Sequence, residues 1–282
     1  MFGVRKTKLK EYLEKWYPSK QIIKSNYNEH IFDEIDTEEK AYWLGFIFAD
    51  GYINSGPLNG EFSYKFELTL ADKDIDHLRK FANFIGYNKS ISKKVCKRND
   101  KEYKAVRISI SSKHLWNTLN NLGCTPRKSL TLKFPEESIF KEKSLIRHFI
   151  RGYFDGDGTL GVYDYKVGEY TYHDKCICSI LGTKAFLERL KEFFKFDKTI
   201  KSAGSENYSN NAFRITYTCK QALKVSIILY KNSKIYLDRK YLKYLEFCRL
   251  YEESYKELQT KIGEDCDVNP EVIIETKESV TP

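Results

Sequence analysis

Hydrophobic and polar residues alternate along several short stretches of the chain, as they do in strands with one buried face. In residues 64–70 (YKFELTL), aromatic and aliphatic side chains take every second position, and Lys65, Glu67 and Thr69 stand between them. Residues 105–111 and 212–218 alternate in the same way, and their polar faces are Arg107, Ser109 and Ser111 in the first and Arg214, Thr216 and Thr218 in the second. Each strand is expected to cover helices with one face and to leave the other open to solvent or a ligand.

Other stretches carry apolar residues at helical spacing. Thr37 can cap a helix that begins with two glutamates and continues as the apolar run 41–49. A second such run precedes Asp157, and shorter amphipathic stretches cover residues 75–85 and 185–196. The order predicts helix, strands, helix, strands and helix, twice over, which is an α+β architecture with antiparallel sheets.

The two halves of the chain repeat at a fixed offset of 107 residues. "WLGFIFADG" (43–51) aligns with "IRGYFDGDG" (150–158), and "AVRISISSK" (105–113) aligns with "AFRITYTCK" (212–220). Two separated matches at one offset indicate duplication of a unit of about 100 residues. We therefore expect two fused subdomains related by an approximate twofold axis.

Small residues recur one turn apart on the two expected central helices. Gly45 lies four residues before Ala49, and Gly152 lies four residues before Gly156, so the two helix backbones can approach closely. Each helix then ends on an aspartate followed by a glycine, which we expect to be a left-handed stop. The spacing predicts a central helix pair at the twofold axis.

Asp50 and Asp157 would lie at the negative ends of two helix dipoles, which costs each roughly 0.3–1 kcal/mol. Repulsion between them adds to this cost unless a proton or a cation is bound there. Mg²⁺, or Mn²⁺ or Ca²⁺ in the same site, is held by few carboxylates and completes its coordination with water and phosphate oxygens. The pair therefore predicts a divalent metal site, which beside a basic sheet is typical of phosphodiester hydrolysis.

The Asp-Gly pairs have two other interpretations. A calcium-binding loop needs an acid or asparagine where Thr159 stands and a glycine where Leu160 stands, so residues 155–160 (DGDGTL) fail that pattern twice. Each pair could instead be a hairpin turn, although this would have to hold in both copies at the same offset.

The net charge of the chain indicates which class of molecule it binds. The 282-residue chain has a formal charge of +9, and residues 1–263, with 47 basic and 33 acidic side chains, carry +14. A basic body favours nucleic acid over a membrane, because no stretch pairs a basic face with a long apolar one. There is no apolar run near 18 residues and no signal-peptide core, and the seven cysteines lack a CxxC pair. These features indicate an intracellular protein in a reducing compartment.

The chain divides into four expected segments. Residues 1–36 form a basic extension with interleaved aromatic residues, either a DNA-contacting helix or a surface helix packed on the body. Residues 37–135 and 136–255 form the two subdomains. Residues 256–282 form an acidic tail whose composition predicts disorder.

At the two Asp-Gly runs the chain resembles the LAGLIDADG homing endonucleases of the single-chain kind with two motifs. "WLGFIFADG" and "IRGYFDGDG" keep the central glycine, the acid at the eighth position and the final glycine of the nine-residue signature. The resemblance extends over roughly residues 37–251. It implies that the two sheets form a saddle for double-stranded DNA, with the central helix pair at the dyad.

The resemblance also implies roles for single residues. Asp50 and Asp157 would be the catalytic metal ligands, one in each half. The family places a basic residue near each metal, and the best matches are Lys128 in "TPRKSL" and Lys240 in "LDRKYL", which could also be ordinary lysines at helix starts. Asp155 occupies a position that is more often structural.

Further residues are expected to contact DNA or water. The candidates for base contacts on the sheets are Lys65, Arg107, Ser109, Arg214 and Thr216. The candidates for phosphate contacts are Arg127 and Arg239, and those for a water network at the strand ends are Asp72, Lys73, Thr183 and Lys184.

The sequence thus predicts a monomeric, sequence-specific endonuclease that acts on a long DNA site by metal-dependent hydrolysis, and the resemblance implies that the double-strand break is staggered. One rival is an RNA-splicing maturase, which would add intron RNA as a partner, or a DNA-binding regulator on the same fold with cleavage reduced or lost. An intein endonuclease is a second rival, but no N-terminal Cys or Ser and no C-terminal His-Asn ending is present. A third is an unrelated α+β nucleic-acid protein whose Asp-Gly pairs are turns.

Overall fold

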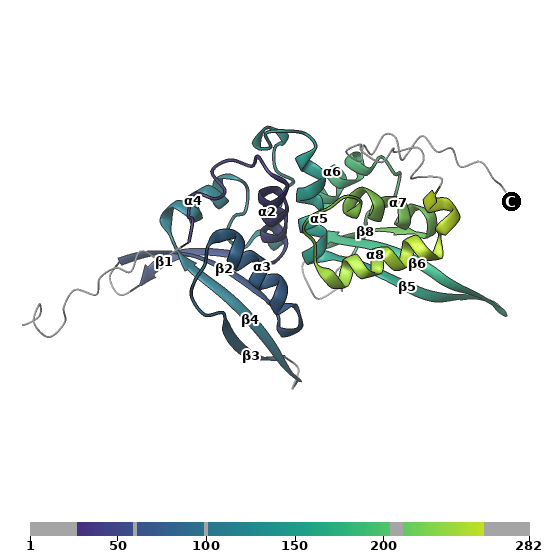
Figure 1. Ribbon diagram of the computed structural model, residues 1–282, viewed down its shortest axis with the longest axis horizontal. Helices are drawn as coiled ribbons and strands as arrows, with labels where there is room; N and C mark the ends of the chain where they lie inside the picture. Colours follow the sequence, from purple (N-terminus) through teal and green to yellow (C-terminus); the bar gives the residue numbers. More distant parts are fainter. Residues whose placement is uncertain (1–26, 59–60, 99–100, 204–210, 257–282) are drawn as a thin grey trace, which may run out of the picture.

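The computed structural model of the chain describes residues 27–58, 61–98, 101–203 and 211–256. Expectations for the basic extension up to residue 26 and for the acidic tail from residue 257 lie outside the described residues. The described part forms two four-stranded antiparallel sheets with helices packed on them (Figure 1). The predicted α+β class is confirmed.

The elements of the first half follow the predicted order. They are α2 (Glu38–Asp50), β1 (Gly51–Leu58), β2 (Glu61–Ala71), the 3-10 turn η1 (Asp72–Asp74), α3 (Ile75–Ile85), β3 (Ser92–Arg98), β4 (Lys101–Ser111) and α4 (Lys113–Asn121). Two further 3-10 turns, η2 (Lys128–Leu130) and η3 (Glu137–Ile139), lead into the second half.

The second half repeats this order and adds a helix. Its elements are α5 (Leu145–Asp157), β5 (Gly158–Val167), β6 (Tyr170–Gly182), α6 (Lys184–Phe194), β7 (Lys201–Ser202), β8 (Phe213–Thr218), α7 (Cys219–Tyr230) and α8 (Asp238–Leu250). The added helix is α8, which stands where the first half has only the short turn η2.

Both sheets have the same strand order, β1-β2-β4-β3 in the first and β5-β6-β8-β7 in the second. In the first sheet Leu68 pairs with Ile108, and both are buried. In the second sheet Ser179 pairs with Thr216, and their hydroxyl groups lie 3.2 Å apart. Apolar and polar faces therefore run continuously across the strands, and the predicted alternation is confirmed.

Local sequence sets the helix ends. The hydroxyl of Thr37 accepts a hydrogen bond from the backbone N–H of Lys40 and caps α2, as predicted. Thr183 caps α6 in the same way through the N–H of Phe186. Gly86 ends α3 in the left-handed conformation with φ 68°, which glycine adopts without steric cost.

Helices α2 and α5 lie side by side at the centre of the molecule, with one sheet on either side (Figure 1). The hydrophobic core continues across them: Phe48 of α2 meets Phe149 of α5 edge to face, with ring centroids 5.0 Å apart. None of the helices in the described part of the chain is long and apolar enough to cross a membrane.

Candidate active site

Two glycines allow α2 and α5 to come into backbone contact. A Cβ atom added to Gly45 would lie 1.9 Å from the carbonyl oxygen of Phe149, and one added to Gly152 would lie 1.8 Å from that of Tyr42. Gly45 and Gly152 hold matching positions in the two sequence copies, so the two contacts are equivalent. Because both partners are backbone atoms, no side-chain rotation can relieve the overlap. The predicted close helix pair is confirmed.

The predicted left-handed glycine after each aspartate is wrong. Gly51 has φ −73° and ψ 147°, and Gly158 has φ −92° and ψ 165°, so both are extended. These glycines are required for space instead. A Cβ atom on Gly51 would lie 2.6 Å from the carbonyl oxygen of Ile47, and one on Gly158 would lie 2.5 Å from that of Phe154. Each central helix passes directly into a strand at its glycine. The chain can change direction there because the glycine has no side chain to collide with the last helical turn.

Asp50 and Asp157 meet where the two helices end. A Cβ atom added to Gly156, the residue before Asp157, would lie 3.2 Å from Oδ2 of Asp50. Desolvation by the surrounding protein, followed by the charge of Asp157, raises the pKa of Asp50 to about 6. Desolvation also raises the pKa of Asp157. Protein atoms crowd both groups, but Asp50 remains exposed and Asp157 partly exposed, so a ligand can reach the pair.

A lysine closes the C-terminal end of each central helix. Nζ of Lys128 donates to the carbonyl oxygens of Ala49 at 3.1 Å and Gly51 at 2.5 Å. Nζ of Lys240 donates to two carbonyl oxygens in the last turn of α5, at 2.5 and 2.8 Å. The last carbonyl groups of a helix have no following turn to pair with, and a cation there also stabilises the negative end of the helix dipole.

The electrostatic effect of each lysine reaches the opposite half. Among the nearby cations, Lys240 lowers the pKa of Asp50 most and Lys128 lowers that of Asp157 most. Burial lowers the pKa of Lys240 itself to about 8. Each lysine therefore supports the helix of its own half, and it is also the nearby cation with the largest effect on the candidate-site aspartate of the other half. Sequence reasoning expected a lysine near each acid but not this crossed arrangement.

Tyr153 makes the two acids unequal. Its hydroxyl donates to the carbonyl oxygen of Leu181 at 2.9 Å. Desolvation raises the pKa of Asp157, and a hydrogen bond from Tyr153 offsets part of this effect, after the two lysines. Phe46 occupies the matching position in α2, so Asp50 has no such phenol. Sequence reasoning missed Tyr153, for which the only signal was a tyrosine in one copy and a phenylalanine in the other.

Asp155 has a structural environment. It is buried and accepts hydrogen bonds from the hydroxyl groups of Tyr42 at 2.7 Å and Tyr230 at 2.6 Å. The backbone N–H of Leu237 donates to it at 2.8 Å. These bonds tie α5 to α2, to α7 and to the start of α8, and they leave this carboxylate no access to solvent.

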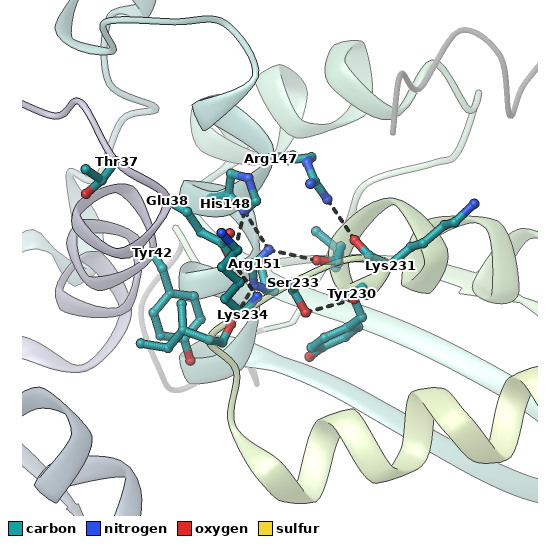
Figure 2. A network of polar contacts seen from close by, with 12 residues as sticks. Thr37, Glu38, Tyr42, Arg147, His148, Arg151, Tyr230, Lys231, Ser233 and Lys234 are labelled. Atoms are coloured by element: carbon teal, nitrogen blue, oxygen red, sulfur yellow. Dashed lines mark hydrogen bonds and ion pairs between the residues drawn. The ribbon is translucent and has the colours of Figure 1, made fainter. Parts of the chain in front are cut away.

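A buried polar network joins the two halves near the start of α2 (Figure 2). Arg151 donates to Glu38 of the first half at 2.7 Å and to the backbone of Ile235 at 2.9 Å. Burial, with the charges of neighbouring arginines, lowers the pKa of His148 to about 2, so its ring is neutral. Nδ1 of His148 lies 2.7 Å from Arg151 and accepts from it. The backbone N–H of Lys234 also donates to Glu38, at 2.8 Å.

On the polar face of the first sheet, three predicted DNA-contact residues converge on Glu67. One carboxylate oxygen, Oε1, lies 2.8 Å from Nζ of Lys65 and 2.8 Å from Nη1 of Arg107. The hydroxyl of Ser109 donates to the same oxygen at 3.4 Å. The carboxylate holds these side chains in one orientation and reduces the positive charge of this face.

The second sheet presents a more open surface. Arg214 is exposed, and together with Thr216 it lines a cleft of about 510 Å³ that also includes Lys201. Lys201 of β7 is the backbone pairing partner of Arg214 of β8, so two cationic residues on neighbouring strands line the same cleft. The polar faces of the two halves therefore differ in charge although their strand order is the same.

The remaining predicted residues have different environments. Arg127 is exposed and has φ 57°, whereas Arg239 forms an ion pair with Asp74 of the first half, with Nε 3.0 Å from Oδ1. The hydroxyl of Thr183 caps α6 and donates to the carbonyl oxygen of Leu132, so it is not free to order water. The other candidates for a water network are partly or fully exposed: Asp72, Lys73 and Lys184.

Solved structures share this architecture. I-SmaMI bound to an uncleaved DNA target in the presence of calcium ions matches with a TM-score of 0.51 at 15% identity, over 78% of this chain and 93% of that chain. The I-LtrWI LAGLIDADG homing endonuclease bound to target DNA matches with a TM-score of 0.50 at 14% identity, over 82% of this chain and 100% of that chain. The chain has the LAGLIDADG homing endonuclease fold. No family model and no curated protein matches it.

Within this LAGLIDADG fold, the donor set at the ends of α2 and α5 fits a hard divalent cation. Asp50 and Asp157 offer carboxylate oxygens, which Mg²⁺ and Ca²⁺ prefer. Lys128 and Lys240 are bonded to helix carbonyl groups, so neither amine occupies the carboxylates. Desolvation raises the pKa of both acids, and the charge of Asp157 raises that of Asp50 further, so a cation bound there would favour their ionised forms.

Proposed function

We propose that this protein is a sequence-specific DNA endonuclease that acts as a monomer and makes a staggered double-strand break by divalent-metal-dependent hydrolysis. The observation that carries the proposal is the pair Asp50 and Asp157, set at the ends of two helices that touch backbone to backbone. Two equivalent acids at a pseudo-twofold axis suit a substrate whose two strands are also related by a twofold axis.

In the proposed mechanism, Asp50 and Asp157 hold Mg²⁺, which supplies an activated water and neutralises charge on the phosphate when bound. Both carboxylates must be ionised for this, so protonation of Asp50 below about pH 6 would remove a ligand. Lys128 and Lys240 keep the opposite carboxylate ionised and add positive charge where phosphate oxygens would approach. The hydroxyl of Tyr153 lies near Asp157 and has no counterpart near Asp50, which supports unequal rates on the two strands.

The two polar sheet faces are the proposed surface for double-stranded DNA. Lys65, Arg107 and Ser109 would contact bases from the first sheet, with Glu67 fixing their orientation, and Arg214 and Thr216 from the second. Arg127 is free to contact a phosphate, whereas Arg239 would first have to leave Asp74. Support comes from the fold, and from I-LtrWI and I-SmaMI, each of which is bound to its target DNA.

Cleavage of a defined substrate tests this function. The substrate is a plasmid library made from the DNA on either side of the gene for this chain, joined as the uninterrupted allele. With Mg²⁺ the protein is expected to linearise one member of the library, and EDTA is expected to stop the reaction. Asp50→Asn and Asp157→Asn should each lower the double-strand cleavage rate by at least about 10³-fold, because each removes a metal ligand.

The matched control is Asp164→Asn, which changes an exposed aspartate on β5 that contacts the surface residue His173 and accepts a hydrogen bond from the backbone N–H of Asp174. It should cleave like the wild type. DNA binding by the two active-site variants, measured in Ca²⁺ by mobility shift, should stay within about threefold of the wild type. Full cleavage by Asp50→Asn would rule out the assigned site, and binding without cleavage by the wild type would favour a regulator or maturase.

A further inference from the structure

Away from the central helices, the segment before α2 and helix α4 bring two histidines and an aspartate together. Nδ1 of His30 lies 2.8 Å from Oδ2 of Asp33, and Nε2 of His114 lies 2.6 Å from Oδ1 of the same carboxylate. The two imidazole centroids are 4.0 Å apart, tilted at 45°. One nitrogen or oxygen atom from each of the three residues lies within 4.8 Å of the other two.

We propose that His30, Asp33 and His114 form a binding site for a divalent transition-metal ion of the zinc type, separate from the acid pair at the centre of the molecule. Two imidazole nitrogens and one carboxylate oxygen are a common protein ligand set for such ions, with water completing the shell. Ligand atoms at about 2.0–2.2 Å from one tetrahedral ion are roughly 3.4 Å apart. The observed separations need only small side-chain movements to reach this.

The side chains have the freedom to make that movement. The side chains of His30 and His114 are 63% and 40% exposed, so both rings can rotate without disturbing the core. Thr118, one turn after His114 on α4, donates to Oδ1 of Asp33 at 3.2 Å and holds the carboxylate in place.

The ring hydrogens can also adjust to a bound metal. Nδ1 of His30 and Nε2 of His114 face the carboxylate of Asp33 at 2.8 and 2.6 Å. A bound cation would replace the two ring N–H hydrogens that face Asp33. Each neutral ring would then carry its hydrogen on the opposite nitrogen, which can bond to water because both rings are partly exposed.

The site would be selective and independent of the proposed nuclease function. Imidazole nitrogen favours Zn²⁺, Co²⁺, Ni²⁺ and Cu²⁺ over Mg²⁺, whereas Asp50 and Asp157 offer oxygen alone. His114 lies 81 residues after Asp33 in the sequence, so the three ligands converge only in the folded chain. A metal there would clip the segment before α2 to α4 and stabilise the folded state.

Titration of the full chain with Co²⁺ in the presence of excess Mg²⁺ tests the site. The titration uses the Asp50→Asn, Asp157→Asn double variant, so that the acid pair contributes nothing. One equivalent of Co²⁺ is expected to give the visible absorption of a nitrogen-ligated ion, and Zn²⁺ should displace it. His30→Ala and His114→Ala should each weaken binding by at least about tenfold, since one ligand is lost.

The matched control is His173→Ala. Nδ1 of His173 lies 3.1 Å from Oδ2 of Asp164, and within the described residues His173 belongs to no three-ligand cluster. This variant should bind Co²⁺ like its parent, and Zn²⁺ should raise its Tm but not that of His114→Ala. Unchanged Co²⁺ binding in His30→Ala, whose ring is largely exposed, or an equal loss in His173→Ala, would overturn the proposal.

Discussion

Gly45 and Gly152 show how much can depend on the absence of a single carbon atom. Each glycine lies against a carbonyl group of the opposing helix, at a distance where a methyl group would overlap with backbone. The same seam holds Asp50 next to Gly156, so the spacing of the acids depends on the glycines. Sequence reasoning could predict this from the i, i+4 spacing, because small residues one turn apart have few other uses on an apolar helix face.

Replacing Gly45 with alanine is therefore expected to cost about 3 kcal/mol or more of unfolding free energy, at the upper end of overpacking effects. The matched control is Gly56→Ala in β1, where an added Cβ would meet nothing within 4 Å and the change should stay within about 0.5 kcal/mol. Urea denaturation followed by circular dichroism measures both. Equal stability of the two variants would show that α2 and α5 do not touch.

A second prediction at this scale concerns Asp50. Because its pKa in the folded chain is about 6, above the ordinary value of 3.8, the folded state binds a proton more readily than the unfolded state. In the metal-free protein, the contribution of Asp50 to the unfolding free energy is greatest below about pH 4 and is lost as the pH rises through 6. Asp50→Asn should thus be more stable than the wild type at pH 7.5, by about 1 kcal/mol after allowance for its exposure, and equal to it near pH 4.

Thermal unfolding from pH 4 to 8 in EDTA measures this difference. Adding Mg²⁺ at pH 7.5 should raise the Tm of the wild type and leave that of Asp50→Asn nearly unchanged, because the variant has lost a ligand. A stability difference that does not depend on pH would contradict the raised pKa.

At the level of elements, the ends of α2 and α5 are built from parts that are distant in sequence. Lys128 and Lys240 reach carbonyl groups that lie 77 to 86 residues earlier in the chain. Their recognition as matching residues depended on the short motifs around them. The contacts of these lysines could not be predicted, because the same short motif can hold a lysine that only begins a helix or a lysine that lies near a metal. In the structure Lys128 begins the 3-10 turn η2 and Lys240 lies in the first turn of α8, and each side chain also donates to carbonyl groups at the end of a central helix.

The same limit applies to other elements. Alternation in residues 64–70, 105–111 and 212–218 predicted the strands and their buried faces, because that pattern is local. The conformation of Gly51 was predicted wrongly, since Asp-Gly after a helix usually means a left-handed stop, and only the fold shows that a strand follows directly. The convergence of Lys65 and Arg107 on Glu67 also depends on the register between β2 and β4, which the sequence of one strand does not determine.

Lys240→Met tests the lysine that closes α5. Lys240 is buried, and methionine fills similar space without a donor, so two helix carbonyl groups lose their hydrogen bonds. The expected cost is about 1–3 kcal/mol of unfolding free energy. Lys243→Met, on the next turn of α8 and paired at the surface with Glu246, should cost less than about 0.5 kcal/mol. Similar losses in both variants, measured in urea, would argue against the buried contact.

Across the whole molecule, the two halves share one hydrophobic core and several polar links. Arg151 reaches Glu38, Arg239 reaches Asp74, and Asp155 binds Tyr42. These links surround the helix seam, so a change in one half is expected to affect the other. Arg151 is fully buried, and its charge is balanced by Glu38 across the seam (Figure 2).

Glu38→Gln is therefore expected to destabilise both halves together, by about 2–4 kcal/mol, because it leaves the buried guanidinium without its counter-charge. Glu39→Gln, on the adjacent exposed position, is the matched control and should change stability by less than about 0.5 kcal/mol. With Trp16 replaced by phenylalanine in every variant, the remaining tryptophans are Trp43 in α2 and Trp116 in α4, so fluorescence reports on the first half while circular dichroism reports on the whole chain. In Glu38→Gln the two unfolding curves should shift together and remain superimposed. Curves that separate would mean that the halves unfold independently, in which case the seam could not hold Asp50 and Asp157 at a fixed distance.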